Sequence, residues 1–529
     1  MSQFFSQWND DPKENLPLNL LNENNLVGIK KALTDIHFPK NKSDSIKARV
    51  RLKFEELFFL QLELLLRKEI GKKKSKGLVF SHIGDYFNSF YSNHIPFELT
   101  GAQKKVVKEI RKDFLSGQQM NRLLQGDVGS GKTLVAILNM LICIDNGYQA
   151  TLIAPTEILA NQHFETINAL LGKINLSVFL LTGSSKKSER KVINENLLNG
   201  GANILIGTHA ILEDSVVFKK LGLVVIDEQH RFGVAQRAKM WAKGNPSPHI
   251  LVMTATPIPR TLAMTFYGDL DVSVIDELPP GRKPISTIHR FDSHRLKLFS
   301  FIKEEVKRGR QVYIVYPLIQ ESEKLDFNNL MDGYESISRA FPLPEFKVSI
   351  VHGQMKADDK QMEMNRFVKG ETNIMVATTV IEVGVNVPNA SIMVIESAER
   401  FGLSQLHQLR GRVGRGSDKS YCILMTGNKL TKDAKLRMET MTNTNDGFEV
   451  AEVDLKLRGA GDLMGTKQSG LLDLKIADLS KDGQILMLAR KSAIEILSSD
   501  PLLEENKNLL LRNKMIEILK NKPNWGKIS

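Results

Sequence analysis

Cysteine is scarce in this chain of 529 residues, which contains only two. Cys143 and Cys422 both fall in apolar runs, so neither a disulfide framework nor a cysteine-based zinc site can be built, and buried thiols are expected. No run approaches about eighteen uninterrupted apolar residues, and the N-terminus has no basic region followed by an apolar core. We expect a soluble, cytoplasmic protein without a membrane partner.

The length and the net charge further limit the number of domains and the kind of partner to expect. A chain of 529 residues is too long for one hydrophobic core, so roughly two to four domains are expected. The hydrophobic content of 42% and charged content of 25% are ordinary for a globular protein. The formal net charge of +12 and the pI near 9.3 favour polyanionic partners such as nucleic acid, although many basic proteins bind none.

The hydrophobic spacing predicts an α/β protein with helical ends. Residues 43–70 indicate a long amphipathic helix with Ser43 as its N-cap. The basic cluster 72–76 indicates a linker or, alternatively, a nucleic-acid contact. From residue 96, β-branched runs alternate with helical patterns, as is typical of parallel sheets covered by helices. Besides the strand that leads into Gly126, the expected strands are 151–155, 204–207, 223–226, 250–253, 312–315, 348–351, 374–377, 392–395 and 421–425.

A turn-rich, proline-bearing segment divides these strands into two similar lobes. It covers residues 278–284, and a helical tail follows residue 426. The expected domains are an N-terminal helical connector, two α/β lobes and a C-terminal helical region, with the bounds 1–95, 96–280, 281–428 and 429–529.

A phosphate-binding loop is the most informative motif. Residues 126–133 read GDVGSGKT, which matches the P-loop pattern, with an apolar strand before and a helix after. The glycines let backbone N–H groups turn toward a phosphate chain, and the helix adds the positive end of its dipole. Lys132 is expected at the β- and γ-phosphates and Thr133 at Mg²⁺. The candidate ATP-binding residues are Gly126, Asp127, Val128, Gly129, Ser130, Gly131, Lys132 and Thr133.

Two further segments carry charge suited to phosphoryl transfer. A buried strand ends in Asp227 and Glu228, so Asp227 can bind Mg²⁺ and Glu228 can accept a proton from the attacking water. The alternative is a strand that ends in ordinary surface acids. Residues 405–415 read QLHQLRGRVGR; an arginine from a second lobe can neutralise transition-state charge, although a solvated basic face is the alternative.

Taken together, the motifs closely resemble those of superfamily-two helicases, and more narrowly the RecG family of bacterial branched-DNA translocases. The resemblance covers about residue 15 to beyond residue 480. The segments that carry it are PFELTGAQ at 96–103, GDVGSGKT at 126–133, APTEILANQH at 154–163, DEQHRFGV at 227–234, TAT at 254–256, ATTVIEVGVNVPNA at 377–390, QLHQLRGRVGR at 405–415 and TNDGFEVAEVDLKLRGAGDLMGTKQSG at 444–470.

This resemblance implies a role for each matching residue. Gln103 would read the adenine edge, with Phe97 and Gly384 also at the nucleotide. Arg412 and Arg415 would be the finger arginines. The residues that relay the nucleotide state are His230, Thr254 and Thr256, and those that line the DNA path are Thr156, Glu157, Thr208 and His352. For the threonines and His352, an ordinary turn or strand-end hydrogen bond is the alternative.

The C-terminal block resembles the helical hairpin and loop that convert lobe closure into DNA movement. Arg458 and Gln468 are the candidates for its mechanical contacts, and a glycine-rich turn held by local hydrogen bonds is the alternative. Many relatives have proline where Ala460 stands. The family normally begins with an oligonucleotide-binding barrel, and no such run of strands precedes residue 96. We therefore expect duplex translocation with weak fork unwinding.

The sequence thus predicts two RecA-like α/β lobes and an enzyme that uses ATP and Mg²⁺. Its expected activity is translocation on double-stranded and branched DNA, as a monomer, in recombination, repair and replication restart. The competing interpretations are another superfamily-two motor, such as an RNA helicase or the translocase module of a transcription-repair coupling factor, and a non-catalytic fork-binding protein.

Overall fold

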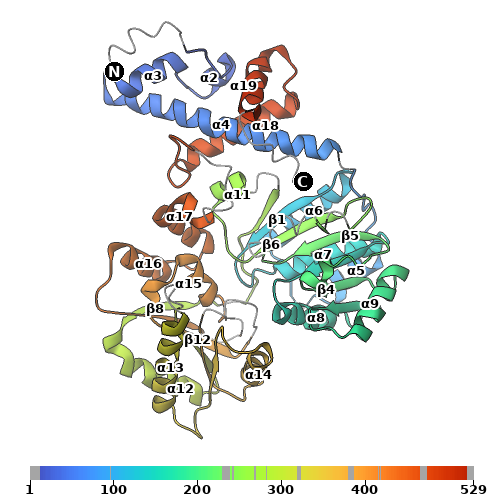
Figure 1. The fold of residues 1–529 in the computed structure, drawn as a ribbon, viewed down its shortest axis with the longest axis vertical. Helices are drawn as coiled ribbons and strands as arrows, with labels where there is room; N and C mark the ends of the chain where they lie inside the picture. Colours follow the sequence, from blue (N-terminus) through green and yellow to red (C-terminus); the bar gives the residue numbers. More distant parts are fainter. Residues whose placement is uncertain are drawn as a thin grey trace. The chain divides into compact units, whose positions relative to one another are not determined.

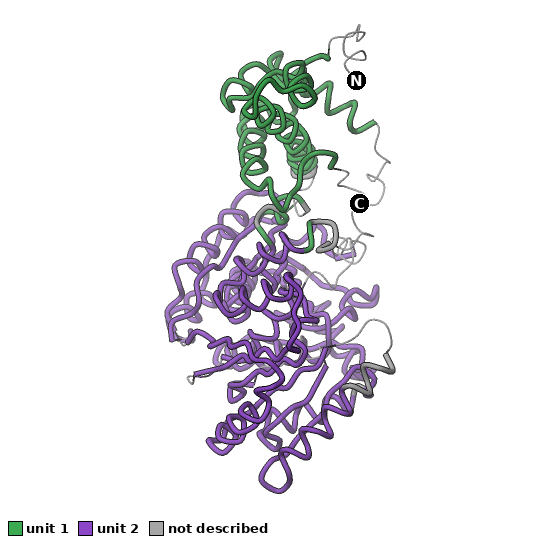
Figure 2. The backbone as a smooth tube through the Cα atoms, turned by 90° about the vertical axis from the view of Figure 1, so that its left-hand side faces the viewer, with its two compact units in different colours: residues 1–75, 259–271, 458–529 green, residues 76–258, 272–457 purple. Residues whose placement is uncertain are grey.

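The chain forms two compact units, coloured separately in Figure 2. Unit 1 contains residues 1–75, 259–271 and 458–529, and unit 2 contains residues 76–258 and 272–457. The computed structural model describes residues 12–74, 76–95, 97–228, 239–240, 243–266, 270–281, 283–317, 323–378, 387–414, 416, 419–464 and 474–520. Among the helices in these ranges, none combines the length and apolar character that crossing a membrane would need.

The regular secondary structure in the described residues of unit 1 is helical, apart from Asp271, which begins strand β7 (Asp271–Ile275). Its longest element is α4 (Lys42–Lys74), which packs along α3 and α18 (Figure 1). The Asn41 carboxamide accepts the N–H of Asp44 at 2.9 Å, so Asn41 caps this helix and the prediction of Ser43 as N-cap is wrong. The other helices are α2 (Leu18–Glu23), α3 (Ile29–His37), α11 (Arg260–Phe266), α18 (Gly483–Ser499), η6 (Asn506–Asn508) and α19 (Leu509–Lys520).

The first lobe of unit 2 is a seven-stranded sheet in the order β3-β4-β2-β5-β6-β1-β7. Its strands are β1 (Asn121–Gly126), β2 (Gln149–Ile153), β3 (Val178–Leu181), β4 (Ile204–Gly207), β5 (Leu221–Ile226), β6 (His249–Thr254) and β7 (Asp271–Ile275). Its helices are α5 (Asp85–Asn93), α6 (Gly101–Leu115), α7 (Lys132–Asp145), α8 (Glu157–Leu171), α9 (Lys187–Asn199) and η1 (His209–Leu212). The core lies mainly between the sheet and α7, whose residues are nearly all buried.

The second lobe is a six-stranded sheet in the order β10-β11-β9-β12-β13-β8, and its strand pairs are parallel. Its strands are β8 (Ser286–Phe291), β9 (Gln311–Val315), β10 (Val348–Val351), β11 (Ile374–Ala377), β12 (Ala390–Ile395) and β13 (Tyr421–Thr426). Its helices are η3 (Asp292–His294), α12 (Arg295–Lys307), α13 (Glu323–Ala340), α14 (Ala357–Val368), η5 (Ala398–Arg400), α15 (Leu403–Arg410), α16 (Lys432–Asn443) and α17 (Gly447–Met464), of which residues 458–464 belong to unit 1.

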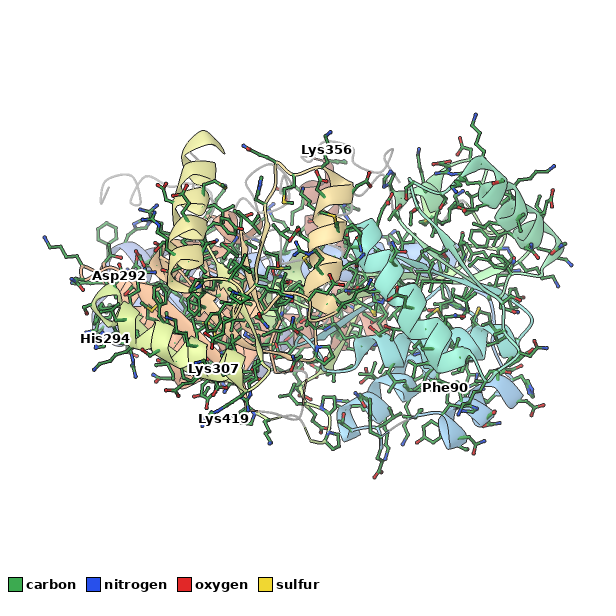
Figure 3. The ribbon with its side chains drawn as sticks, turned by 90° about the horizontal axis from the view of Figure 1, so that it is seen from below. Phe90, Asp292, His294, Lys307, Lys356 and Lys419 are labelled. Carbon is green, nitrogen blue, oxygen red and sulfur yellow. The ribbon has the colours of Figure 1, made fainter. Side chains whose placement is uncertain are left out.

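Strand residues of the second lobe alternate between two cores. Val312 and Ile314 of β9 pack with α12 and α13, whereas Tyr313 and Val315 pack with α14, α15 and α16. Helices therefore cover both faces of the sheet, and the predicted α/β class with two parallel-sheet lobes is confirmed. In Figure 3, Lys307 marks the end of α12, where a basic side chain suits the negative end of the helix dipole.

Candidate nucleotide site

The P-loop joins β1 to α7 at the carboxyl edge of the first sheet. Gly129 and Gly131 have φ values of 78° and 88°, which only glycine adopts easily. A Cβ on Gly126 would lie 2.5 Å from the Ser130 Oγ, so the loop has no room for a side chain there. Residues 126–131 therefore form a tight loop of backbone that leads directly into the N-terminus of α7, the kind of structure that binds phosphate.

Lys132 and Gln103 hold this loop in place. The Lys132 Nζ donates to the carbonyl oxygens of Gly126 and Asp127, at 2.7 and 2.8 Å. The fully buried Gln103 donates through Nε2 to the Ser130 carbonyl at 2.8 Å, and its Oε1 accepts the N–H of Thr100 at 3.0 Å. Both polar atoms of Gln103, the predicted adenine reader, are therefore engaged by the protein. Thr133 is half-buried in the first turn of α7.

The two acids end β5 at the same sheet edge, two strands from β1. The Asp227 Oδ2 lies 2.8 Å from the His163 Nε2, and its Oδ1 accepts the Glu228 N–H at 3.0 Å. Burial raises the pKa of Asp227, but the contact with His163, the charge of Lys132 and the Glu228 N–H together bring this pKa below its ordinary value. Asp227 is thus an anionic oxygen donor, of the kind that Mg²⁺ prefers.

The second lobe meets the P-loop at the turn after α15. A Cβ on Gly411 would lie 2.8 Å from the Val128 Cβ, so only glycine allows this approach. Arg412 follows directly and is buried. The His407 Nε2 lies 2.6 Å from the Asp127 Oδ1. Side chains of one lobe therefore touch the phosphate loop of the other.

Among the predicted relay and DNA-path residues, Thr254, Thr256 and Thr156 have local hydrogen bonds. The Thr254 and Thr256 hydroxyls are 2.9 Å apart. Thr156 caps α8 by accepting the Leu159 N–H.

The remaining residues predicted for the DNA path lie at the start of α8, after β4 and after β10. Glu157 accepts both the N–H and the hydroxyl of Ser184, at 3.0 and 2.8 Å. Thr208 is buried after β4, and its hydroxyl has no hydrogen-bond partner among the described residues. Burial, and then the nearby Lys360, lowers the pKa of His352, which follows β10.

Several predicted site residues do not enter the described arrangement. Phe97 is 41% exposed, and Arg458 is exposed on α17. The predicted residues that lie outside the described part of the chain are His230, Gly384, Arg415 and Gln468.

Two histidines at the site were not predicted from the sequence. His163 contacts Asp227 and His407 contacts Asp127, although each occurs inside a segment already recognised as a motif. A histidine in a nucleotide-site motif is the only signal that the sequence offers, and it does not identify the partner.

Three family matches cover most of the chain. They are the DEAD/DEAH box helicase family at residues 100–265, the helicase conserved C-terminal domain at 295–417, and the C-terminal part of domain 3 of the ATP-dependent DNA helicase RecG at 444–529. The chain is 49% identical to the ATP-dependent DNA helicase RecG of Synechocystis sp. over 94% of its length, but covers only 59% of that relative. It is 45% identical to the Bacillus subtilis protein of the same name, covering 98% of the chain and 75% of the relative.

A solved structure supports the same assignment. The structure of RecG bound to a three-way DNA junction matches with a TM-score of 0.70 and 43% identity, over 92% of this chain and 64% of that one. The Streptococcus pneumoniae relative, also named ATP-dependent DNA helicase RecG, is 48% identical and is covered over 73% of its length. The chain belongs to the RecG family of ATP-dependent DNA helicases.

Proposed function

We propose that this chain is an ATP-driven translocase on double-stranded DNA that remodels branched DNA. The observation that carries the proposal is the convergence of Lys132, Asp227 and the second-lobe turn on one phosphate loop. Relatives named as ATP-dependent DNA helicases, one of them bound to a three-way DNA junction, support the choice of substrate. The basic net charge of +12 suits a polyanionic track.

The residues present fit a nucleotide with Mg²⁺. A glycine cradle and Lys132 suit the phosphates, while the Thr133 hydroxyl and the Asp227 carboxylate are oxygen donors of the kind Mg²⁺ prefers. The bound ion would neutralise charge between the phosphates. Glu228, in the left-handed conformation at φ 53°, turns directly after Asp227 and is our candidate base for the attacking water.

Arg412 and Arg415 are our candidates for cations that stabilise the transferred phosphoryl group from the second lobe. Hydrolysis would then require the two lobes to stay together, and release would follow when they part. Both halves of the site come from one chain, so we propose that a monomer suffices. DNA binding through the phosphate backbone would be independent of sequence and would weaken with salt.

The test is ATP hydrolysis by the purified chain without nucleic acid and with duplex DNA, a three-way DNA junction or RNA. We expect DNA to stimulate hydrolysis, and Lys132→Ala to abolish it because the charge at the phosphates is lost. Lys105→Ala is the matched control, since Lys105 is an exposed lysine of α6.

The outcomes separate the competing functions. Strongest stimulation by RNA would favour an RNA motor over a DNA translocase. Full activity of Lys132→Ala would show that the P-loop does not carry the reaction. Binding to the three-way junction without any hydrolysis by the unaltered chain would indicate a non-catalytic fork-binding protein.

A further inference from the structure

The carboxylate of Asp127 in the P-loop faces the second lobe. Its Oδ1 lies 2.6 Å from the Nε2 of His407 in α15, and its Oδ2 accepts the N–H of Gly447 at 3.2 Å. Gly447 is the first residue of α17. The first N–H groups of a helix have no partner inside the helix, so Asp127 supplies one from the opposite lobe.

The second contact of His407 indicates which ring nitrogen carries the proton when the ring is neutral. Its Nδ1 lies 2.8 Å from an Nη atom of Arg410. A guanidinium group can only donate hydrogen bonds, so Nδ1 must be the acceptor. The ring proton of neutral His407 is therefore on Nε2, where it is donated to Asp127.

Arg410 is itself anchored within the second lobe. It is buried and donates to the carbonyl oxygens of Met441 and Thr444, at 3.0 and 2.7 Å. Those carbonyls lie at the end of α16, directly before α17. A chain of hydrogen bonds thus runs from the P-loop through α15 to the junction of α16 and α17.

The negative charge and partial burial of the Asp127 carboxylate make the loss of either of its hydrogen bonds unfavourable. Burial raises the pKa of Asp127, but the hydrogen bonds from His407 and from the Gly447 N–H and the charge of Lys132 outweigh it, so the pKa lies below its ordinary value. A partly buried carboxylate that loses a donor is disfavoured. The contact between the two lobes is therefore most stable when both the His407 ring and the Gly447 N–H donate to Asp127.

We propose that Asp127, His407 and Arg410 form a clasp that positions the second lobe on the phosphate loop during ATP turnover. The clasp rests on the proposed function above. It makes Asp127 and His407 positioning residues: they hold the Gly411–Arg412 turn against Val128. Lys132 binds the Asp127 carbonyl oxygen, so a nucleotide that draws Lys132 away also moves the residue that carries the clasp.

Kinetics of four variants test the clasp. His407→Phe keeps the ring volume but removes both ring nitrogens. We expect kcat for DNA-stimulated ATP hydrolysis to fall roughly 10- to 100-fold, because the second lobe is no longer held in position on the P-loop. KM for ATP should change by less than about twofold, since both carboxylate oxygens of Asp127 are engaged by the second lobe. His407→Gln, which has a donor and an acceptor, should recover most of the loss. Asp127→Asn should lower kcat, and adding it to His407→Phe should lower kcat no further than the worse single change.

Ser404→Ala is the matched control. Ser404 also lies on α15 and donates to the Asp454 carboxylate of α17 at 2.8 Å, but it does not touch the P-loop. We expect its kcat to stay within about twofold of the unaltered chain. Additive losses in the double variant, or an unchanged kcat for His407→Phe, would overturn the clasp. A rise in KM confined to Asp127→Asn would instead make Asp127 a nucleotide ligand.

Amide hydrogen exchange tests the clasp without any catalysis. The Gly447 N–H should exchange roughly tenfold faster in Asp127→Asn and in His407→Phe than in the unaltered chain, whereas Ser404→Ala should not change it. If the unaltered chain showed no ATP hydrolysis, the proposed function would fail while this measurement still decided the clasp. Equal exchange at Gly447 in all variants would exclude it.

Discussion

Acidification should destabilise the first lobe through one buried histidine. His249 of β6 is fully buried, and the Phe80 and Phe114 ring centroids lie 5.0 Å from the centroid of its ring. Its Nδ1 accepts the N–H of Met120 at 2.9 Å, so its Nε2 carries the proton that is donated to the Leu78 carbonyl at 2.9 Å. A second proton would have to displace the Met120 contact inside an apolar core. Burial accordingly lowers the pKa of His249 from 6.5 to about 4, although the Leu78 contact opposes this.

The sign and size of the effect follow from that pKa. Between pH 6.5 and about 4, the unfolded chain binds a proton at His249 that the folded chain does not, so the free energy of unfolding falls as the pH falls. The contribution is fully present above pH 6.5 and is lost as the pH drops toward 4. Each unit is worth about 1.4 kcal/mol, so the loss reaches about 2 kcal/mol at pH 5 and about 3 kcal/mol at pH 4.

Urea unfolding between pH 7.5 and 5, followed by circular dichroism, measures this loss. His249→Gln keeps a donor and an acceptor but does not titrate, so its unfolding free energy should fall by about 2 kcal/mol less than that of the unaltered chain over this range. His209→Gln, a change at an exposed histidine, is the control and should leave the pH dependence unaltered. Parallel pH profiles for the unaltered chain and His249→Gln would refute the reasoning.

Three further outcomes are expected. In a urea titration, Gln125→Leu should raise the free energy of unfolding by about 1–3 kcal/mol, because both amide atoms of Gln125 are buried without a hydrogen-bond partner among the described residues. Asn139→Leu removes a 2.7 Å hydrogen bond to the Val135 carbonyl, so it should raise the free energy of unfolding by less. Arg51→Met should lower the free energy of unfolding by about 3–5 kcal/mol, since Arg51 is fully buried against Glu14 and Glu55. Raising salt from about 50 to 200 mM should weaken duplex binding at least roughly tenfold by fluorescence anisotropy, as counterion release requires; a salt-independent affinity would contradict phosphate contacts.

The sequence predicts the central strands well because burial on both faces leaves a continuous apolar run. All ten expected strands form, within two residues of the predicted bounds. The three strands that were missed, β3, β7 and β8, all lie at sheet edges. β8 reads STIHRF and is half-exposed or exposed along its whole length. An edge strand has one neighbour and more solvent, so its composition resembles that of a loop.

Part of the candidate site was also predictable from the sequence. The spacing of GDVGSGKT implies its backbone geometry, since positive φ values at Gly129 and Gly131 are what the glycines permit. The pairing of Asp227 with the P-loop follows from the rule that parallel strands end at the same edge. The contact of Val128 with Gly411 does not follow from any such rule, because it depends on how one lobe docks on the other.

Three histidines are buried in the part of unit 2 that the structure describes, and the sequence alone does not predict their roles. His163 faces the Asp227 carboxylate, His249 lies between a backbone donor and a backbone acceptor, and His407 lies between Asp127 and a guanidinium group. An imidazole can donate, accept or do both, so the residue type leaves each role open. In His249 and His407 the partner at Nδ1 is a donor, which places the proton on Nε2. The two residues differ in what receives that proton. For His249 it is a carbonyl within the same lobe, so the contact stabilises that lobe, whereas for His407 it is a carboxylate of the opposite lobe, so the contact links the two lobes.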